Sequence, residues 1–211
     1  MNLEKFKIKV NPEYTALVII DMQRDYCCEG GIFNKMGFDL EVPKWLASRL
    51  NEFVNKVRKV LKFIIHIKME LNPYLRSPAL AEHYERVGLQ RKHDPSYSEF
   101  YGVTPREGEI IIPKYRYSAF VSTYLDQYLR SNGIKTLVLV GLATNVCVES
   151  TAREGFMRDY HIVIPGDMTE GTSKEAKRAS LFNIDTFFGE VVDSKDLLSA
   201  WGLKDQSNNP C

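Results

Sequence analysis

The sequence predicts an α/β fold, a three-layer doubly wound sandwich around a mainly parallel six-stranded sheet. Short apolar runs rich in β-branched residues recur along the chain, and segments with helical periodicity separate them. Helix-length connections between strands are typical of right-handed crossovers, which make the strands parallel and cover both faces of the sheet. Because the 211 residues contain neither an internal repeat nor a linker, we expect a single domain over residues 1–211.

The first half of the chain predicts two strands and a long helix. The apolar run 15–20 is followed at once by the polar cluster 21–31, as at the end of a buried parallel strand. Between residues 43 and 61 apolar residues recur at intervals of three and four, which predicts a helix leading into a second strand at 63–68. Residues 69–108 contain four prolines and lack regular periodicity, and long irregular segments often wall a binding site.

The second half repeats the alternation of strands and helices. Four further strands are predicted at 109–112, 136–140, 161–165 and 186–192. Helices are predicted at 123–131, 145–158, 174–183 and 194–201, and Gly133 stands where the first of these is expected to end. This order of elements completes the doubly wound arrangement.

Composition and charge favour a small-molecule substrate. The net charge is +1, with 28 basic and 27 acidic residues spread along the chain, so we expect neither a nucleic acid nor a membrane as partner. The apolar runs fall far short of the roughly 20 residues of a membrane span. Residues 1–10 lack the features of a secretory signal, so we expect a cytoplasmic protein. In that compartment the four cysteines, Cys27, Cys28, Cys147 and Cys211, are expected to stay thiols.

Three polar residues stand at or just after predicted strand ends. Asp21 follows the first strand, Lys114 follows the third, and Cys147 follows the turn after the fourth. In doubly wound sheets, ligands bind at the carboxyl ends of the strands, so these distant residues can converge there. Each also has a simpler role when taken alone: Cys as a small buried apolar residue, Asp as a turn or cap residue, and Lys as a solvated charge.

Together the three residues suit nucleophilic catalysis by a thiol. A thiol attacks a carbonyl only as thiolate, so it needs a base and a positive potential. Cys147 lies in the first turn of a predicted helix, where free N–H groups favour an anion, and Lys114 adds a full positive charge. Asp21 would accept the thiol proton and return it to the leaving nitrogen. We therefore expect Cys147 to be alkylated well below pH ~8.5, the ordinary thiol range.

Three blocks of the sequence resemble the signature blocks of isochorismatase-like cysteine hydrolases. They read ALVIIDMQ at 16–23, KYRYSAF at 114–120 and GLATNVCVEST at 141–151, in the order found in that family. The resemblance implies that Asp21, Lys114 and Cys147 form a catalytic triad. It further implies a cis peptide between Leu142 and Ala143, and an oxyanion hole made by the N–H groups of Ala143 and Cys147.

Within this superfamily, the stretches 141–156 and 181–189 most resemble the ureidoacrylate amidohydrolases of pyrimidine breakdown. The resemblance implies substrate contacts from Tyr117, Gln23, Leu142 and Asn145. Tyr117 is equally well read as an aromatic residue packed at the rim. Residues 74–102 lack the Gly-Ser-Trp pattern of those relatives, so the pocket can differ even where the chemistry is shared.

The sequence predicts no metal and no organic cofactor. Nicotinamidases of this superfamily hold a metal with an Asp-x-His pair soon after the second strand, where this chain has Glu70-Leu-Asn72-Pro73. A carboxylate and an amide are poor replacements for that pair. The histidines show no paired spacing and are expected in the core or on the surface: His66, His83, His93 and His161. Three cations of the irregular segment can pair with a substrate carboxylate but are better read as surface charges: Arg76, Arg91 and Lys92.

The leading hypothesis is a cysteine amidohydrolase that cleaves a C–N bond of a small ureido or carboxamide substrate through a covalent intermediate on Cys147. Isochorismatases proper lack the nucleophilic cysteine, so its presence favours C–N hydrolysis. The alternatives within the enzyme class are an N-carbamoyl amino acid amidase, such as one acting on N-carbamoylsarcosine, and a nicotinamidase. A catalytically silent binding protein on the same fold is the alternative outside it. From relatives we expect a homodimer or homotetramer.

Overall fold

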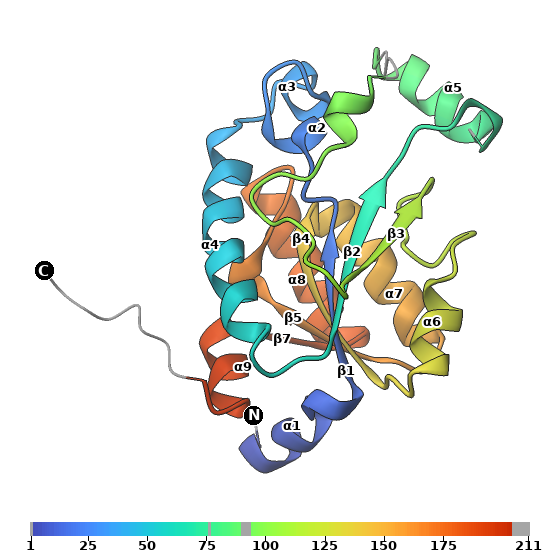
Figure 1. Ribbon diagram of the computed structural model, residues 1–211. Helices are drawn as coiled ribbons and strands as arrows, with labels where there is room; N and C mark the ends of the chain where they lie inside the picture. Colours follow the sequence, from blue (N-terminus) through green and yellow to red (C-terminus); the bar gives the residue numbers. More distant parts are fainter. Residues whose placement is uncertain (1, 76, 90–93, 204–211) are drawn as a thin grey trace, which may run out of the picture.

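A parallel sheet forms the middle layer of the protein, whose computed structural model describes residues 2–75, 77–89 and 94–203 (Figure 1). Six strands run in the order β3-β2-β1-β4-β5-β7, and a two-residue strand, β6, pairs only with β4. The strands are β1 Thr15–Ile20, β2 Phe63–Met69, β3 Ile110–Lys114, β4 Thr136–Leu142, β5 His161–Pro165, β6 Thr169–Glu170 and β7 Glu190–Val192. The predicted fold class is confirmed, with β6 as a short addition to the six predicted strands.

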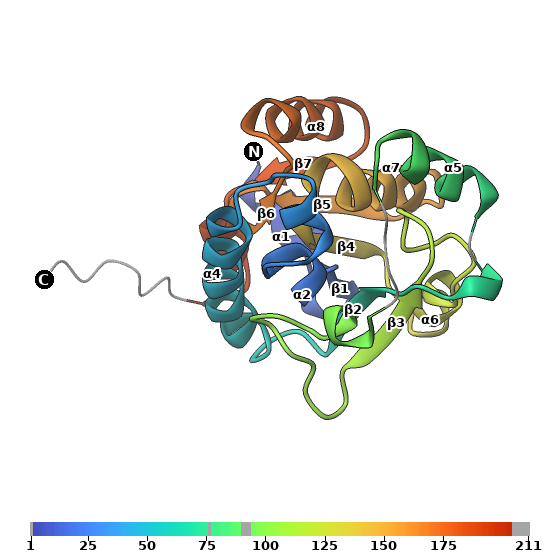
Figure 2. The ribbon, with the colours of Figure 1, turned by 90° about the horizontal axis from the view of Figure 1, so that it is seen from above.

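Helices cover both faces of the sheet, as Figures 1 and 2 show. α4 and α9 lie on one face, and α6 and α7 lie on the other, where α8 packs beside α7 and β7. The α-helices are α1 Leu3–Lys9, α2 Arg24–Cys27, α3 Ile32–Lys35, α4 Glu41–Val57, α5 Pro78–Arg86, α6 Leu125–Ser131, α7 Glu149–Met157, α8 Lys174–Phe187 and α9 Ser194–Ala200. This layering leaves the carboxyl ends of β1, β3 and β4 at one edge, where α2, α3 and α5 also lie.

The predicted strand at 186–192 is too long at its start. Helix α8 continues to Phe187, where the hydroxyl of Thr186 donates to the carbonyl of Phe182 one turn back, and β7 begins only at Glu190. Gly189 sits between them because a Cβ there would lie 2.5 Å from the carbonyl oxygen of Ile162. The apolar run therefore spans the end of a helix and a strand.

The segment 69–108 contains a helix that periodicity missed. Ser77 caps α5 by accepting from the N–H of Leu80, and Pro78 occupies its first turn, where its missing N–H costs nothing. None of the residues in α5 is buried, so the segment carries no strong apolar stripe. The Ser-Pro pair was the available signal for it.

The amino-terminal edge of the sheet is held by polar anchors remote from the carboxyl edge. The buried hydroxyl of Thr136, at the start of β4, donates to the carbonyl of Lys9 at 2.6 Å. The indole N–H of Trp201 donates to the carbonyl of Val10 at 2.7 Å. These bonds tie α1 and the end of α9 to the base of the sheet.

His66 lies in the core, as expected, and pairs with a carboxylate. Its Nε2 is 2.8 Å from Glu109 Oε2, while Arg58 Nε donates to the other oxygen at 2.6 Å. Burial by itself raises the pKa of Glu109, but hydrogen bonds from Arg58, the Arg106 N–H and His66 outweigh it and lower the pKa to about 2. His83 and His161 are exposed, and His93 lies outside the described residues.

This carboxylate predicts acid-sensitive stability. Because the pKa of Glu109 in the folded protein, about 2, lies below its ordinary value of 4.5, its contribution is present above about pH 4.5 and is lost as pH falls toward 2. We expect Glu109→Gln to lower the free energy of unfolding at pH 6 and to differ less and less from the wild type as the pH drops through this window. Urea unfolding at several pH values measures the difference.

The neighbouring exposed residue Glu107 supplies the control. Glu107→Gln should leave the free energy of unfolding close to that of the wild type at every pH. A deficit of Glu109→Gln that stays constant from pH 6 to pH 2.5 would contradict the assignment.

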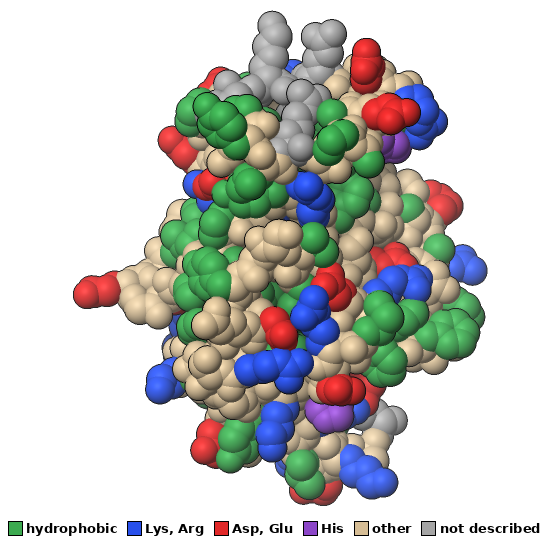
Figure 3. Space-filling view, turned by 90° about the vertical axis from the view of Figure 1, so that its right-hand side faces the viewer, with side chains coloured by type: hydrophobic (Ala, Val, Ile, Leu, Met, Phe, Trp, Pro, Cys, Tyr) green, Lys and Arg blue, Asp and Glu red, His purple; other side chains and the backbone are tan. Residues whose placement is uncertain are grey.

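The outer surface carries charges of both signs. On the face shown in Figure 3, acidic and basic side chains are interspersed, and neither sign gathers into an extended patch. Across residues 2–75, 77–89 and 94–203, no helix combines the length and apolar character needed to cross a bilayer.

Candidate active site

Asp21, Lys114 and Cys147 meet at the carboxyl edge of the sheet. The Lys114 ammonium nitrogen lies 2.7 Å from Asp21 Oδ2 and 3.2 Å from Cys147 Sγ. The three residues are almost completely buried, with exposed fractions of 0% for Lys114, 1% for Asp21 and 5% for Cys147. A carboxylate, a cation and a thiol that are remote in sequence therefore form one buried cluster.

Asp21 is placed by a sharp turn at the end of β1. Its φ of 53° is in the left-handed region, which Asp adopts more readily than most residues. Its N–H donates to the carbonyl of Ile67 in β2, and its carbonyl accepts from the N–H of Gln23. Its carboxylate pairs with the Lys114 ammonium and is hydrogen-bonded to the Cys147 thiol. The turn therefore brings the carboxylate against both the ammonium and the thiol.

Lys114 ends the edge strand β3 with its side chain turned into the cluster. Its backbone carbonyl accepts from the N–H of Glu70, which continues the pairing of β3 with β2. The ammonium also donates to the carbonyls of Arg116 and Tyr117, each at 3.2 Å. Burial by itself lowers the pKa of Lys114, but the charges of Asp21 and Cys147 and their hydrogen bonds raise it, so the net pKa lies above the ordinary value. The lysine is therefore a permanent cation beside the sulfur.

Cys147 lies in a π-helical turn, Thr144–Val148, between β4 and α7. Gly141 in β4 has a φ of +105°, and a Cβ there would lie 2.2 Å from the carbonyl oxygen of Ile20, so only glycine fits. The peptide bond between Leu142 and Ala143 is cis. The Ala143 carbonyl accepts from the N–H groups of Val146 and Val148, at 3.0 and 3.2 Å, which fixes the turn that carries the thiol.

The surroundings of Cys147 in this structure favour the neutral thiol. Burial raises the pKa of Cys147 to about 12; Lys114 lowers it, and the charge of Asp21 and its hydrogen bond with the thiol raise it. This direction runs against the expected alkylation well below pH ~8.5, which stays a prediction: desolvation and the nearby carboxylate oppose the thiolate, and the ammonium favours it. In this buried position, the thiol can form a thiolate only if a neighbouring side chain accepts its proton.

A largely apolar cavity of about 180 Å³ opens above Cys147. Its wall combines residues of α2, α3 and α5 with the loops after β3 and β4. The lining residues are Tyr26, Ile32, Phe33, Met36, Phe38, His83, Tyr84, Val87, Leu89, Tyr117, Ala143, Val146, Cys147 and Thr172. Part of the irregular segment thus does wall the site, through α5. Nothing in the sequence pattern indicated the contribution of α2 and α3.

Of the residues predicted to contact substrate, Tyr117 and the proposed oxyanion donors Ala143 and Cys147 line this cavity. Gln23 is fully buried, and both ends of its side-chain amide bond to other parts of the protein. Nε2 donates to the carbonyls of Met69 and Ser98, and Oε1 accepts from the N–H of Met69. Gln23 therefore ties the end of β2 to the segment that contains Ser98.

The other two predicted substrate contacts have structural partners. Asn145 bonds the hydroxyl and N–H of Thr172, both at 2.9 Å, and so holds the loop after β6. Leu142 is buried in β4. Their predicted contact with substrate stays a prediction.

The residues at the nicotinamidase metal position do not fit a metal here. Glu70 pairs with Lys68 at 3.2 Å, and the side-chain oxygen of Asn72 accepts from the N–H of Tyr74. Among the residues that the structure describes, no group of three or more His, Cys, Asp or Glu side chains gathers as a metal site would require. The cations Arg76, Arg91 and Lys92 lie outside the described residues.

A doubly wound α/β domain with a buried cysteine, lysine and aspartate at the carboxyl edge of its sheet defines the structural class. Residues 15–196 match the isochorismatase domain, and the chain belongs to the isochorismatase family.

Curated relatives cover nearly the whole chain. It is 37% identical to the ureidoacrylate amidohydrolase RutB of Klebsiella pneumoniae, over 90% of this chain and 87% of the relative. It is 34% identical to the protein of the same name from Pantoea ananatis, over 95% of this chain and 87% of that one.

Solved structures share the fold. A cysteine hydrolase from Pseudomonas syringae superposes with a TM-score of 0.80 at 23% identity, covering 92% of this chain and 95% of that one. N-carbamoylsarcosine amidase from Thermoplasma acidophilum has a TM-score of 0.64 at 26% identity, covering 85% and 96%.

Proposed function

We propose that this protein is a cysteine amidohydrolase that cleaves a non-peptide C–N bond of a small ureido or carboxamide substrate. The observation that carries the proposal is the buried contact of the Lys114 ammonium with both the Cys147 sulfur and the Asp21 carboxylate, at the floor of a cavity. A thiol, a proton acceptor and a fixed positive charge are the groups that acyl transfer through sulfur requires.

The first half of the reaction forms a covalent intermediate. Asp21 takes the proton of Cys147, and the Lys114 ammonium stabilises the thiolate. Sulfur attacks the substrate carbonyl carbon, and the N–H groups of Ala143 and Cys147 hold the oxyanion, a type of contact worth about 3 kcal/mol per donor. The C–N bond then breaks as Asp21 returns the proton to the nitrogen, so an amine or ammonia leaves and a thioester or thiocarbamate remains.

The second half releases the acyl or carbamoyl group. Asp21, again ionised, takes a proton from water, and the hydroxide attacks the carbonyl carbon bonded to sulfur. Collapse of the tetrahedral intermediate breaks the C–S bond, and Cys147 recovers its proton from Asp21. The products are a carboxylate or a carbamate. Every proton transfer uses residues of the cluster, so this route requires no metal or organic cofactor.

The ureido acids are the first substrate class to test. Two relatives at 34% and 37% identity are ureidoacrylate amidohydrolases, which supports this choice, and we further propose a role in pyrimidine degradation. An N-carbamoylsarcosine-like substrate is the second candidate, supported by the amidase of that name at 26% identity. A nicotinamidase is less well supported, because Glu70 and Asn72 are engaged with Lys68 and Tyr74.

A substrate panel tests the proposal. The purified protein is incubated with ureidoacrylate, N-carbamoylsarcosine and nicotinamide, with and without chelator, and substrate loss and amine or ammonia formation are measured. We expect turnover of a ureido acid that the chelator does not change. Turnover of nicotinamide that the chelator abolishes would favour the metal-dependent alternative. Binding of a ureido acid without turnover would favour the silent binding protein.

Assembly and location are further proposals. We propose a homodimer or homotetramer, which light scattering of the purified protein measures directly; a monomer would contradict it. We also propose the cytoplasm, because a reducing compartment keeps Cys27, Cys28 and Cys147 as the free thiols that the structure has. Fractionation of cells that express the tagged protein tests this location.

A further inference from the structure

The turn that carries Cys147 is tied to the loop after Lys114 by a single buried hydroxyl. Thr151, one helical turn beyond Cys147, donates to the Cys147 carbonyl at 2.7 Å and accepts from the N–H of Ala119 at 3.0 Å. Thr151 and Ala119 are fully buried. The hydroxyl therefore fixes the backbone of the proposed nucleophile against the segment that follows the lysine.

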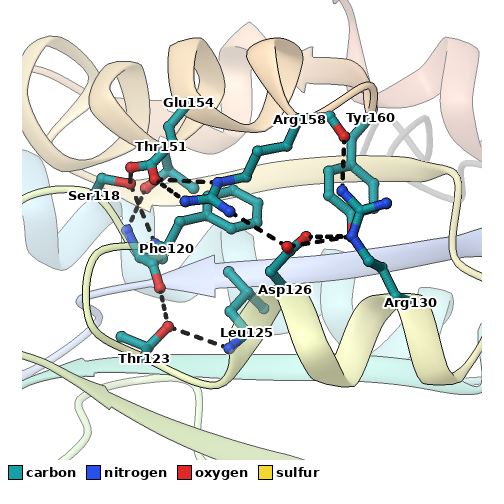
Figure 4. A network of polar contacts seen from close by, with 11 residues as sticks. Ser118, Phe120, Thr123, Leu125, Asp126, Arg130, Thr151, Glu154, Arg158 and Tyr160 are labelled. Atoms are coloured by element: carbon teal, nitrogen blue, oxygen red, sulfur yellow. Dashed lines mark hydrogen bonds and ion pairs between the residues drawn. The ribbon is translucent and has the colours of Figure 1, made fainter.

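A second contact holds the same loop against α7. The hydroxyl of Ser118 donates to Glu154 at 2.6 Å and accepts from the N–H of Phe120 at 3.2 Å. Glu154 is held in turn by Arg158, whose guanidinium donates to its other oxygen. Figure 4 shows Thr151 and Glu154 on α7 facing the segment from Ser118 to Phe120. The loop is thus pinned at two successive residues, 118 and 119.

This pinning reaches Lys114 through the neighbouring carbonyls. The ammonium donates to the carbonyls of Arg116 and Tyr117, and Tyr117 directly precedes the clamped Ser118. These two acceptors balance the pull of the Asp21 carboxylate on the ammonium. If the loop withdrew, the ammonium would lose these two acceptors and keep its contact with Asp21, the strongest remaining attraction, so its distance to the sulfur would no longer be fixed.

We propose that Thr151 and Ser118 are positioning residues that fix the distance between the Lys114 ammonium and the Cys147 sulfur. The inference rests on the proposed role of Cys147 as nucleophile. The ammonium is the group that favours the thiolate, against burial and Asp21, so a longer distance makes the thiol harder to ionise. The other titratable side chains that share the cavity with this thiol are Tyr26, Tyr117, His83 and Tyr84.

The test compares Thr151→Val with Thr151→Ser. Valine keeps the shape and loses both hydrogen bonds, whereas serine keeps the hydroxyl. We expect the alkylation rate of Cys147 by iodoacetamide at a fixed pH between 7 and 9 to fall about tenfold in Thr151→Val, which corresponds to one pKa unit. The modified cysteine is identified by peptide mass spectrometry. kcat should fall with little change in KM, and serine should restore both readouts.

Thr136→Val is the matched control. It also removes a buried hydroxyl that donates to a carbonyl, but at the opposite edge of the sheet. We expect it to lower thermal stability while the alkylation rate and kcat remain those of the wild type. A purely structural role of Thr151 would give both variants the same behaviour.

The outcomes separate the two proposals. If Cys147→Ala is inactive while Thr151→Val alkylates and turns over at wild-type rates, the positioning role is refuted and the proposed function stands. If Cys147→Ala retains turnover, the proposed function itself fails. Should Thr151→Val not fold, Ser118→Ala removes the bonds of this hydroxyl with Glu154 and with the N–H of Phe120. An unchanged alkylation rate in that variant overturns the proposal.

Discussion

Replacing Cys147 by alanine is expected to abolish turnover, with kcat falling about a million-fold, the typical loss when a nucleophile that acts as one unit with its base is removed. The protein should stay folded, because alanine fits the buried position and the Asp21–Lys114 ion pair persists. Activity on the best substrate of the panel and the thermal unfolding midpoint are the two measurements. Cys147→Ser should also be inactive, since a hydroxyl ionises far less readily than a thiol.

Cys27 supplies a control of matched chemistry. It is also a buried thiol whose pKa burial raises to about 12, but the neighbour that perturbs it is Cys28, and it does not line the cavity. Cys27→Ala should keep full activity. Mass spectrometry of the wild type with substrate should show an acyl or carbamoyl adduct on Cys147. Loss of activity in Cys27→Ala together with retained activity in Cys147→Ala would reverse the assignment of the nucleophile.

The layered fold was predictable because its strands are apolar runs and its main helices carry one apolar face. β1 and β4 are buried along their whole length, and α4 buries most of the residues whose spacing predicted it, although Trp45 is half exposed. The apolar pattern did not predict an element correctly where its side chains do not divide into a buried face and an exposed face. Helix α5 buries none of its residues, and only Phe188 and Gly189 separate the end of α8 from β7.

The candidate site was predictable to the level of which residues meet. Asp21 and Cys147 follow buried strands and Lys114 ends an edge strand, and parallel strands bring their carboxyl ends to one edge of the sheet. The environment of the thiol was not predictable, because its pKa depends on desolvation, which only the packed structure defines. The partners of Gln23 and Asn145 were hidden for a similar reason: each bonds a segment distant in sequence.

Breaking the buried ion pair should cost both stability and activity. Asp21→Asn leaves the Lys114 ammonium without a carboxylate, and Lys114→Met leaves the Asp21 carboxylate without a cation. A buried charge left unpaired costs about 3–5 kcal/mol of unfolding free energy. Each variant also loses a group that ionises or stabilises the thiol, so we expect kcat to fall by about 10⁴-fold or more. Urea unfolding and turnover on the same preparations measure both effects.

The double variant Asp21→Asn/Lys114→Met separates the two effects. With both charges gone, no buried charge is left unpaired, so we expect much of the lost stability to return, since replacing a whole buried pair is often neutral. Activity should not return, because neither a proton acceptor nor a cation remains beside Cys147. Lys44→Met, which breaks an exposed pair with Glu41, should leave both readouts unchanged. A double variant that regains turnover would show that the ion pair holds the fold without serving the thiol.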